Sequence, residues 1–479
     1  MVAAACCLGL TLGLRGLKKI RLPPPPAHPH RAPSPALWFT QALDHFDALS
    51  TTTWEQRYWT NFDHYVAGGP AMIMIGGEGE ASPAWMTYGH WYRLAQEQGA
   101  AMFQLEHRYY GASQPTPDMA GENMRFLSSR QGLEDLAVFI AGMNAEYNLT
   151  GPWISFGGSY PGSLSAWLRL KFPHLVAGAV SSSGPLNAKL DYFEYLDVVA
   201  NALATTGPGC VEVISEALTA AEELLTAGSA GWQELSTMFL TCKPLDGNNQ
   251  ADVTSFIELL VDNLAGIVQY NGLLSMDIND VCDIMRDEGL GTPLQRFAEL
   301  NSETLADNGE ECLDHEYASF LALLTDSSWS GGGIGWRQWI WQTCTEFGWY
   351  QTSNQPSGVF GGRLNLEYFE SWCQDAFGAD FSHGRLEDLM AATNAEYGGF
   401  FPQVENVVFV HGSIDPWHAM GVLEDRNERA PAIYINGTSH CADMYPSYPD
   451  DPEELLQARD RITELVNTWI SQAKTGNQA

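Results

Sequence analysis

The stretch Trp153-Ile-Ser-Phe-Gly-Gly-Ser-Tyr-Pro-Gly162 decides the fold, because its pattern is that of a strand, a tight turn and the start of a helix. Gly157 and Gly158 supply the backbone freedom that a sharp strand-to-helix turn requires. Such a turn lifts the side chain of Ser159 above the end of a sheet, the arrangement called a nucleophile elbow. The strict motif has glycine where this chain has Pro161, so the prediction needs an acid and a histidine after later strands.

A helix is expected after this serine, since residues 163–174 carry Leu164, Trp167 and Leu168 at helical spacing. The N–H groups at its N-terminus would face a negative charge that develops beside the serine. We therefore expect the backbone N–H of Tyr160 to be an oxyanion donor.

Length and composition favour one large domain that carries an insertion. The 479 residues are 45% hydrophobic and 11% aromatic, which is enough for a large buried core. The formal net charge of -34 argues against nucleic-acid binding, which needs clustered Lys and Arg. The sequence leaves the oligomeric state open, with a homodimer among the alternatives.

The N-terminal region is predicted to lie outside the fold. Residues 2–14 form an apolar run of signal-peptide length, although the basic residues follow the run instead of preceding it, and we assign 1–21 as a signal peptide. Residues 22–36 are proline-rich and are expected to form an extended linker. No later stretch is long and apolar enough to span a bilayer, so stable membrane insertion is not expected.

The cysteines predict disulfides and no metal site. Cys6 and Cys7 lie in the predicted signal peptide, six others fall between residues 210 and 373, and Cys441 stands apart and is expected to be a free thiol. The absence of Cys-x-x-Cys spacing argues against zinc, and no cofactor is predicted. Six cysteines allow 15 pairings, which the sequence does not resolve. Asn148 and Asn436 begin glycosylation acceptor triplets.

Several uniformly apolar runs are typical of strands buried on both faces of a parallel sheet. The predicted strands, besides the one that ends in the elbow, are 71–75, 101–105, 176–180, 406–410 and 432–435. Helical patterns separate them, including 129–147, and 452–472 closes the chain. This alternation predicts an α/β fold with a doubly wound, mostly parallel sheet, built from residues 37–190 and 396–479.

Between these two parts, residues 191–395 are dominated by helical patterns and contain the six clustered cysteines. An insertion after a strand of such a sheet usually lies over the carboxyl ends of the strands, where ligands bind. We therefore expect a helical cap that restricts access to the site.

The glycine-rich turn Gly76-Gly-Glu-Gly79 follows the strand 71–75. It is expected to offer Gly77 as a second oxyanion donor, although a simple tight turn is the alternative. A phosphate-binding loop is disfavoured because no Gly-Lys-Ser/Thr follows.

An acid and a histidine do follow later strands. Asp415 comes just after the strand 406–410, and His440 follows the strand 432–435. The order Ser159, Asp415, His440 is that of α/β-hydrolases, and it predicts a nucleophile, a base that takes its proton, and an acid that orients the base. His418 and His411 are the rival bases, but the first shares a turn with the acid and the second lies in the strand.

Other polar and aromatic residues have a structural alternative. His107 and Arg108 lie in a charged cluster at a strand end, which is more often a hydrogen-bond network. Ser183 also ends a strand but has no glycines before it. Trp417 is a candidate for a substrate pocket, with simple packing as the alternative.

Three stretches, Leu168-Arg-Leu-Lys-Phe-Pro-His-Leu175, Asp415-Pro-Trp-His418 and Ser439-His-Cys-Ala-Asp-Met444, most resemble the thymus-specific branch of the serine peptidase family of prolyl carboxypeptidase and dipeptidyl peptidase II. Several short motifs together resemble the family as a whole. They are Leu43-Asp-His-Phe46, Gln56-Arg-Tyr58, Gly76-Gly-Glu-Gly79, Glu106-His-Arg-Tyr-Tyr-Gly111, the elbow, Cys344-Thr-Glu-Phe-Gly348 and Asp415-Pro-Trp417. The resemblance covers residues 37–474.

This resemblance implies a triad at Ser159, Asp415 and His440, a disulfide-held cap, peptide substrates, and exopeptidase action with a preference for proline. The chain departs from the two best-known members at Cys441, where they have a second histidine, and this puts the proline preference and the exopeptidase mode in doubt. Action at the amino end would need a carboxylate for the substrate ammonium, for which Glu78 or an acid of the cap is a candidate. The scarcity of Arg and Lys slightly favours that end over the carboxyl end.

Two alternatives stay open at this point. A lipase or esterase would have a broad apolar acyl channel, and a catalytically silent binding scaffold would usually lack one residue of the triad. A secreted or lysosomal location is expected.

Overall fold

The computed structural model describes residues 23–25, 35–331, 333, 335–355 and 357–476. The predicted signal peptide, 1–21, lies outside the described residues, as does most of the predicted linker. Within the described part, no helix has the length and apolar character needed to cross a membrane.

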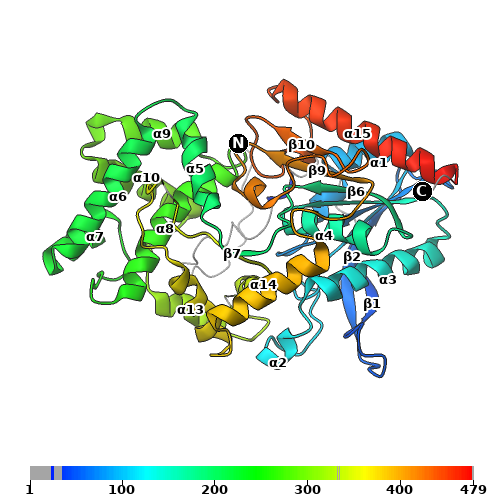
Figure 1. Cartoon of the computed structure of the whole chain (residues 1–479), viewed down its shortest axis with the longest axis horizontal. Helices are drawn as coiled ribbons and strands as arrows, with labels where there is room; N and C mark the ends of the chain where they lie inside the picture. Colours follow the sequence, from blue (N-terminus) through cyan, green and yellow to red (C-terminus); the bar gives the residue numbers. More distant parts are fainter. Residues whose placement is uncertain (1–22, 26–34, 332, 334, 356, 477–479) are drawn as a thin grey trace.

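One mixed sheet of eight strands forms the centre of the larger half of the molecule (Figure 1). Its spatial order is β1-β2-β4-β3-β5-β6-β9-β10, in which β1 and β2 pair antiparallel, β2 and β4 pair antiparallel, and the remaining neighbours are parallel. The strands are β1 (Leu37–Ala42), β2 (Thr53–Asn61), β3 (Ala71–Ile75), β4 (Ala101–Leu105), β5 (Trp153–Gly158), β6 (Val176–Ser182), β9 (Val407–Gly412) and β10 (Ala432–Ile435).

Helices cover both faces of this sheet, as the apolar strands require. On one face, α1 (His90–Gln98) and α15 (Glu453–Lys474) bury a core that includes Ile154 and Trp469. On the other face lie α3 (Ser129–Tyr147) and α4 (Tyr160–Lys171). Two layers of helices around a mostly parallel sheet, with β5 at its centre, confirm the predicted α/β-hydrolase fold.

A mainly helical region stands beside the sheet, at the left of Figure 1. Its helices are α5 (Glu194–Ala204), α6 (Cys210–Thr226), α7 (Ser229–Met238), α8 (Gln250–Gln269), α9 (Ile278–Arg286), α10 (Pro293–Asn308), α11 (Tyr317–Thr325), α12 (Trp336–Gln342), the π-helix η4 (Thr343–Phe347), α13 (Leu366–Phe377) and α14 (His383–Tyr397). We call residues 191–395 the cap. Three disulfides lie within it, Cys210–Cys282, Cys242–Cys312 and Cys344–Cys373, whereas Cys441 is a buried free thiol.

The structure differs from the sequence prediction in a few places. Two short strands pair in parallel, β7 (Lys189–Asp191) at the start of the cap and β8 (Gly348–Tyr350) within it, which the helical pattern did not reveal. The helix after the elbow begins at Tyr160 instead of residue 163. Asn406 has a left-handed φ of 58° and precedes β9 instead of starting it.

Candidate active site

The elbow places Ser159 between the end of β5 and the first turn of α4. Its φ of 66° is unusual for a residue with a side chain, so the turn is held by its surroundings. A Cβ at Gly157 would come within 2.0 Å of the carbonyl oxygen of Pro161, and one at Gly158 within 2.2 Å of Met444 Sδ. Close packing against backbone therefore requires glycine at 157, whereas a side chain at 158 would require the Met444 side chain to move.

Asp415 and His440 form a buried pair. Asp415 follows β9 and His440 follows β10, and His440 Nδ1 lies 2.8 Å from Asp415 Oδ1. The same oxygen accepts a hydrogen bond from the Trp417 backbone N–H at 3.0 Å. Both side chains are 0% exposed. Burial opposes ionisation of Asp415, but the positive charge and the hydrogen bond that His440 can offer hold the pKa of this carboxyl below its usual value.

The elbow meets the loop that carries His440 at the end of β6. We call residues 436–441 the histidine loop. The Ser159 N–H donates to the Ser182 carbonyl at 2.9 Å, and the Cys441 N–H donates to Ser183 Oγ at 2.8 Å. Among the described residues His440 Nε2, the ring nitrogen that faces away from Asp415, has no hydrogen-bond partner. The structure thus brings the serine and histidine to one sheet edge without a hydrogen bond between them.

The Ser159 side chain lies instead beside Glu78, where its hydroxyl acts to lower the pKa of this carboxyl. Burial raises the pKa of Glu78 to about 8, and hydrogen bonds from its own backbone N–H and from Ser159 only partly offset that effect. The Gly76–Gly79 turn packs against the elbow, because a Cβ on Gly77 would lie 2.2 Å from Pro161 Cγ. Tyr160 is the first residue of α4, so its N–H has no partner within the helix. Pro161 has no N–H, and the Gly162 N–H donates to the Ser159 carbonyl at 2.7 Å.

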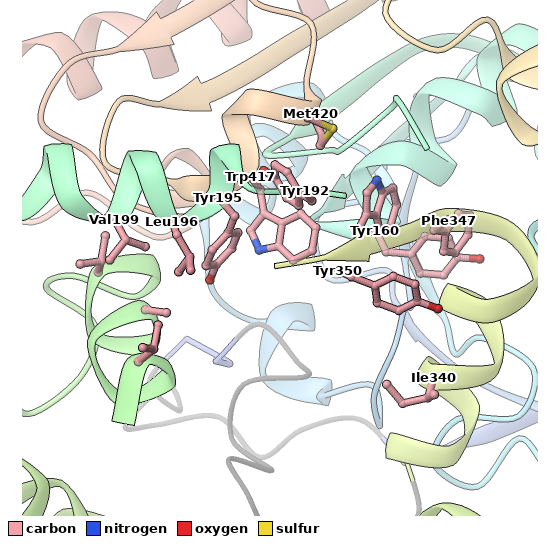
Figure 2. Close-up of a cluster of buried hydrophobic side chains, with 14 of the residues drawn as sticks. Tyr160, Tyr192, Tyr195, Leu196, Val199, Ile340, Phe347, Tyr350, Trp417 and Met420 are labelled. Atoms are coloured by element: carbon pink, nitrogen blue, oxygen red, sulfur yellow. The ribbon is translucent and has the colours of Figure 1, made fainter. Parts of the chain in front are cut away.

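A cavity of about 130 Å³ opens next to Ser159 and runs between the sheet edge and the cap. Figure 2 shows its aromatic surroundings, with Trp417 and Tyr195 on one side and Tyr160 and Tyr350 on the other. Aromatic and aliphatic side chains form most of its wall. The residues that line it from the cap include Leu196, Val261, Ala265, Trp336, Trp339, Ile340, Trp349, Phe369 and Trp372.

Three carboxyl groups also line this first cavity: Glu78 from the sheet edge, and Glu258 and Asp262 from α8. Glu258 accepts a hydrogen bond from the Tyr368 hydroxyl at 2.7 Å. No Lys, Arg or His is found in the lining that the described residues provide. The cavity therefore presents acidic groups on an apolar, aromatic wall.

Some residues of the site were not assigned a role there from the sequence. The Ser183 hydroxyl helps to hold the pKa of Asp415 down and also fixes the backbone of Cys441. Gln269, at the end of α8, accepts hydrogen bonds from the Tyr195 hydroxyl and the Trp417 indole at 2.6 and 3.0 Å. Its backbone carbonyl accepts from the His440 N–H at 3.0 Å. The cap thus contacts the histidine loop directly.

The rival histidines occupy other positions. His418 Nδ1 contacts the Gly412 carbonyl, and its ring packs against Tyr434. His411 is fully buried, and burial lowers its pKa to about 4. His107 contacts the Tyr160 hydroxyl at 3.0 Å.

Arg108 donates to both oxygens of the buried Asp135 at 2.6 and 2.7 Å, as a structural network would. The predicted glycosylation acceptors Asn148 and Asn436 are both exposed.

Comparison with known proteins places the chain in a family. The model of serine carboxypeptidase S28 matches residues 41–462. A putative serine protease of Caenorhabditis elegans, K12H4.7, is 37% identical over 90% of this chain and 87% of its own. The human thymus-specific serine protease is 36% identical, with 91% and 87% covered, and the mouse lysosomal Pro-X carboxypeptidase is 28% identical, with 91% and 89% covered. The family resemblance expected from the short motifs is confirmed: the chain belongs to the serine carboxypeptidase S28 family.

Proposed function

We propose that this chain is a serine exopeptidase that uses Ser159, Asp415 and His440 and removes short fragments from the amino end of peptides. The observation that carries the proposal is the buried Asp415–His440 pair, 2.8 Å apart, at the sheet edge that also bears the strained elbow serine. Because the chain belongs to a serine peptidase family, this arrangement of serine, histidine and aspartate supports hydrolysis of a peptide bond by nucleophilic attack of the serine.

The reaction would begin with a rotation of the Ser159 side chain from Glu78 toward His440 Nε2, which is free to accept a proton. His440 takes the hydroxyl proton while Ser159 attacks the carbonyl carbon, and it passes this proton to the departing amine. Asp415 keeps the Nδ1 proton in place and stabilises the imidazolium. The N–H groups of Tyr160 and Gly77 would bind the oxyanion, and water then hydrolyses the acyl-enzyme.

The charge of the first cavity favours the amino end of the substrate. A free carboxylate would meet the Glu258 and Asp262 carboxyl groups without a described cation in the lining, whereas a substrate ammonium would be attracted. We propose that the two acids of α8 receive this ammonium. Because burial holds Glu78 neutral below about pH 8, its role is to offer hydrogen bonds beside the reacting serine. The indole of Trp417 and the other aromatic walls suit an apolar residue such as proline.

The relative named a Pro-X carboxypeptidase acts at the other end of a peptide, so the experiment must distinguish the two modes. Dipeptide amide reporters with a free amine would be compared with their N-blocked forms and with peptides that end in a free carboxylate. Preference for the free amine, reduced in Asp262→Asn and Glu258→Gln, is expected. Hydrolysis only of substrates with a free carboxyl end contradicts the assigned mode.

A second measurement tests the chemistry independently of the mode. A fluorophosphonate probe should label the wild-type chain and fail to label Ser159→Ala. Labelling that persists in this variant would rule out Ser159 as the nucleophile.

We further propose a secreted or lysosomal location. The disulfides suit an oxidising compartment, and the mouse relative is named lysosomal. The exposure of Asn148 and Asn436 is compatible with glycosylation at both positions.

A further inference from the structure

A second cavity, of about 140 Å³, lies inside the cap between α8 and the end of α10. Part of its wall is apolar, formed by Leu259, Ile267, Leu274, Met276, Leu305 and Leu313. Four carboxyl groups complete the lining, those of Asp262, Asp307, Glu310 and Asp314. The described residues contribute no Lys, Arg or His to it.

This second cavity adjoins the first across α8. Val261, Ala265 and Gln269 line the first cavity, and their spacing of four residues puts them on one stripe of the helix. Residues 259, 263, 266, 267 and 270 line the second from roughly the opposite side of the helix. Asp262 borders both. The two cavities therefore lie on different sides of α8 and share Asp262 as a border.

The second cavity is on the side of the proposed proton donor. Tyr270 lines it, and the Tyr270 ring packs edge-on against His440, with ring centroids 5.9 Å apart. The histidine must protonate the departing amine, so the leaving group lies on the histidine side of the cleaved bond. The part of the peptide released as an amine therefore extends toward Tyr270 and the cavity behind it.

We propose that the second cavity binds a lysine or arginine side chain from the leaving-group part of the peptide substrate. The proposal rests on the proposed function, in which the acyl fragment is short and the leaving group is the remainder of the peptide. An apolar wall would cover the methylene stem of such a side chain, and the carboxyl groups of Asp307, Glu310 and Asp314 would meet its charged head. A neutral or acidic side chain would lose one or both interactions.

The test uses peptide substrates that share one N-terminal dipeptide and differ only in the residues that follow. One series carries lysine at the third to sixth positions, and the matched series carries glutamine or glutamate there. The wild-type chain should cleave the best lysine peptide with a kcat/KM roughly five to ten times that of its glutamine partner, as expected for two or three partly exposed ion pairs. The glutamate peptide should be cleaved more slowly still.

The variant that removes the preference is Asp307→Asn with Asp314→Asn. Asparagine keeps an oxygen that can accept from the Ser275 hydroxyl and the Glu316 N–H, as these aspartates do. The variant should lose most of the lysine preference and retain wild-type activity on a dipeptide reporter, which is too short to reach the second cavity. This reporter also shows that the variant is folded.

The matched control is Asp388→Asn with Asp460→Asn, which removes the same charge from exposed positions outside both cavities. The lysine preference should survive in this control. An equal loss in both variants would assign the preference to the net charge of the chain and overturn the proposal. No difference between lysine and glutamine peptides, with the reporter still cleaved, would also overturn it. A chain that does not cleave the reporter contradicts the proposed function instead.

Discussion

The Gln342 side-chain amide donates a hydrogen bond to the Tyr160 hydroxyl at 3.1 Å, which fixes the end of α12 to the residue that follows the elbow serine. Tyr160 donates in turn to His107 Nε2, because His107 Nδ1 must carry the proton that it gives to the Arg108 carbonyl at 2.7 Å. These side chains are buried. The cap is therefore bonded to the residue whose N–H is proposed to hold the oxyanion.

We predict that Gln342→Leu lowers kcat about tenfold and changes KM little. The hydroxyls of Tyr160 and Tyr110 would each lose a partner, at a cost of roughly 1–3 kcal/mol in stability. A displaced Tyr160 N–H would stabilise the oxyanion of the transition state less well, and such a loss lowers kcat. Steady-state kinetics at a temperature where the variant is folded would measure the effect.

The matched control for this prediction is Gln338→Leu, on the same helix. Gln338 is also buried and donates to the Tyr109 carbonyl at 3.0 Å, but it has no bond to Tyr160. We expect a comparable fall in melting temperature with kcat preserved. Equal losses of kcat in the two variants would show that only the general packing of α12 matters.

Asp415→Asn should lower kcat by about 10³ to 10⁴, because an amide can donate to His440 Nδ1 and stabilise the wrong tautomer. Asp443 offers a control, as it is a buried carboxyl near the same edge that accepts from Ser182 Oγ at 2.6 Å. Asp443→Asn should cost less than tenfold. A comparable loss in both variants would remove the special role assigned to Asp415.

The pKa of Glu78 predicts an alkaline limit to activity. Below about pH 8 the buried carboxyl is protonated, and above it a negative charge stands beside the place where the oxyanion forms. Activity should therefore fall as the pH rises through about 8. In Glu78→Gln this limb should disappear, because glutamine keeps the hydrogen-bonding shape without the charge. An unchanged alkaline limb in the variant would assign it to another group.

The same shift has a consequence for stability. The folded state holds the Glu78 proton more tightly than the unfolded state, whose carboxyl has the ordinary value near 4.5. Between pH 4.5 and about 8 the unfolded chain thus binds fewer protons, and the free energy of unfolding falls as pH rises. Denaturant titrations across this window should show a smaller decline for Glu78→Gln than for the wild-type chain.

Much of the sheet could be predicted because its signals are local. The strand 71–75 is uniformly apolar and 101–105 is apolar except for Gln104, and both have the predicted bounds. Polar residues directly after such strands are carried to one edge by the parallel topology, which is why residues as distant as Asp415 and His440 could be paired from the sequence.

The contacts of the cap could not be predicted in this way. The bonds of Gln269 and Tyr270 to the histidine loop depend on how 191–395 folds back on the sheet, and no periodic pattern encodes that path. The position of the Ser159 side chain beside Glu78 also depends on a side-chain rotation, which chain order does not specify. Helical spacing identified α8 as a helix without indicating that it separates two cavities.

The disulfide Cys344–Cys373 should matter for activity as well as stability. It joins η4 to α13. Thr343 of η4 and Trp372 of α13 both line the first cavity. Replacing both cysteines with alanine should lower the free energy of unfolding by roughly 2–4 kcal/mol. Because the cavity wall loses this cross-link, we also expect kcat/KM to fall about tenfold while the chain is still folded.

The Cys210–Cys282 disulfide provides the comparison, because it joins α6 to α9 and neither helix lines either cavity. Its double alanine variant should lose a similar amount of stability. Per folded molecule, its kcat/KM should match that of the wild-type chain, since the cavity wall keeps its own cross-link. Thermal unfolding would be measured alongside the rate of reporter cleavage for both pairs. If the two variants lose activity in the same proportion, the effect comes from global destabilisation and the cross-link at Cys344 has no particular role in shaping the cavity.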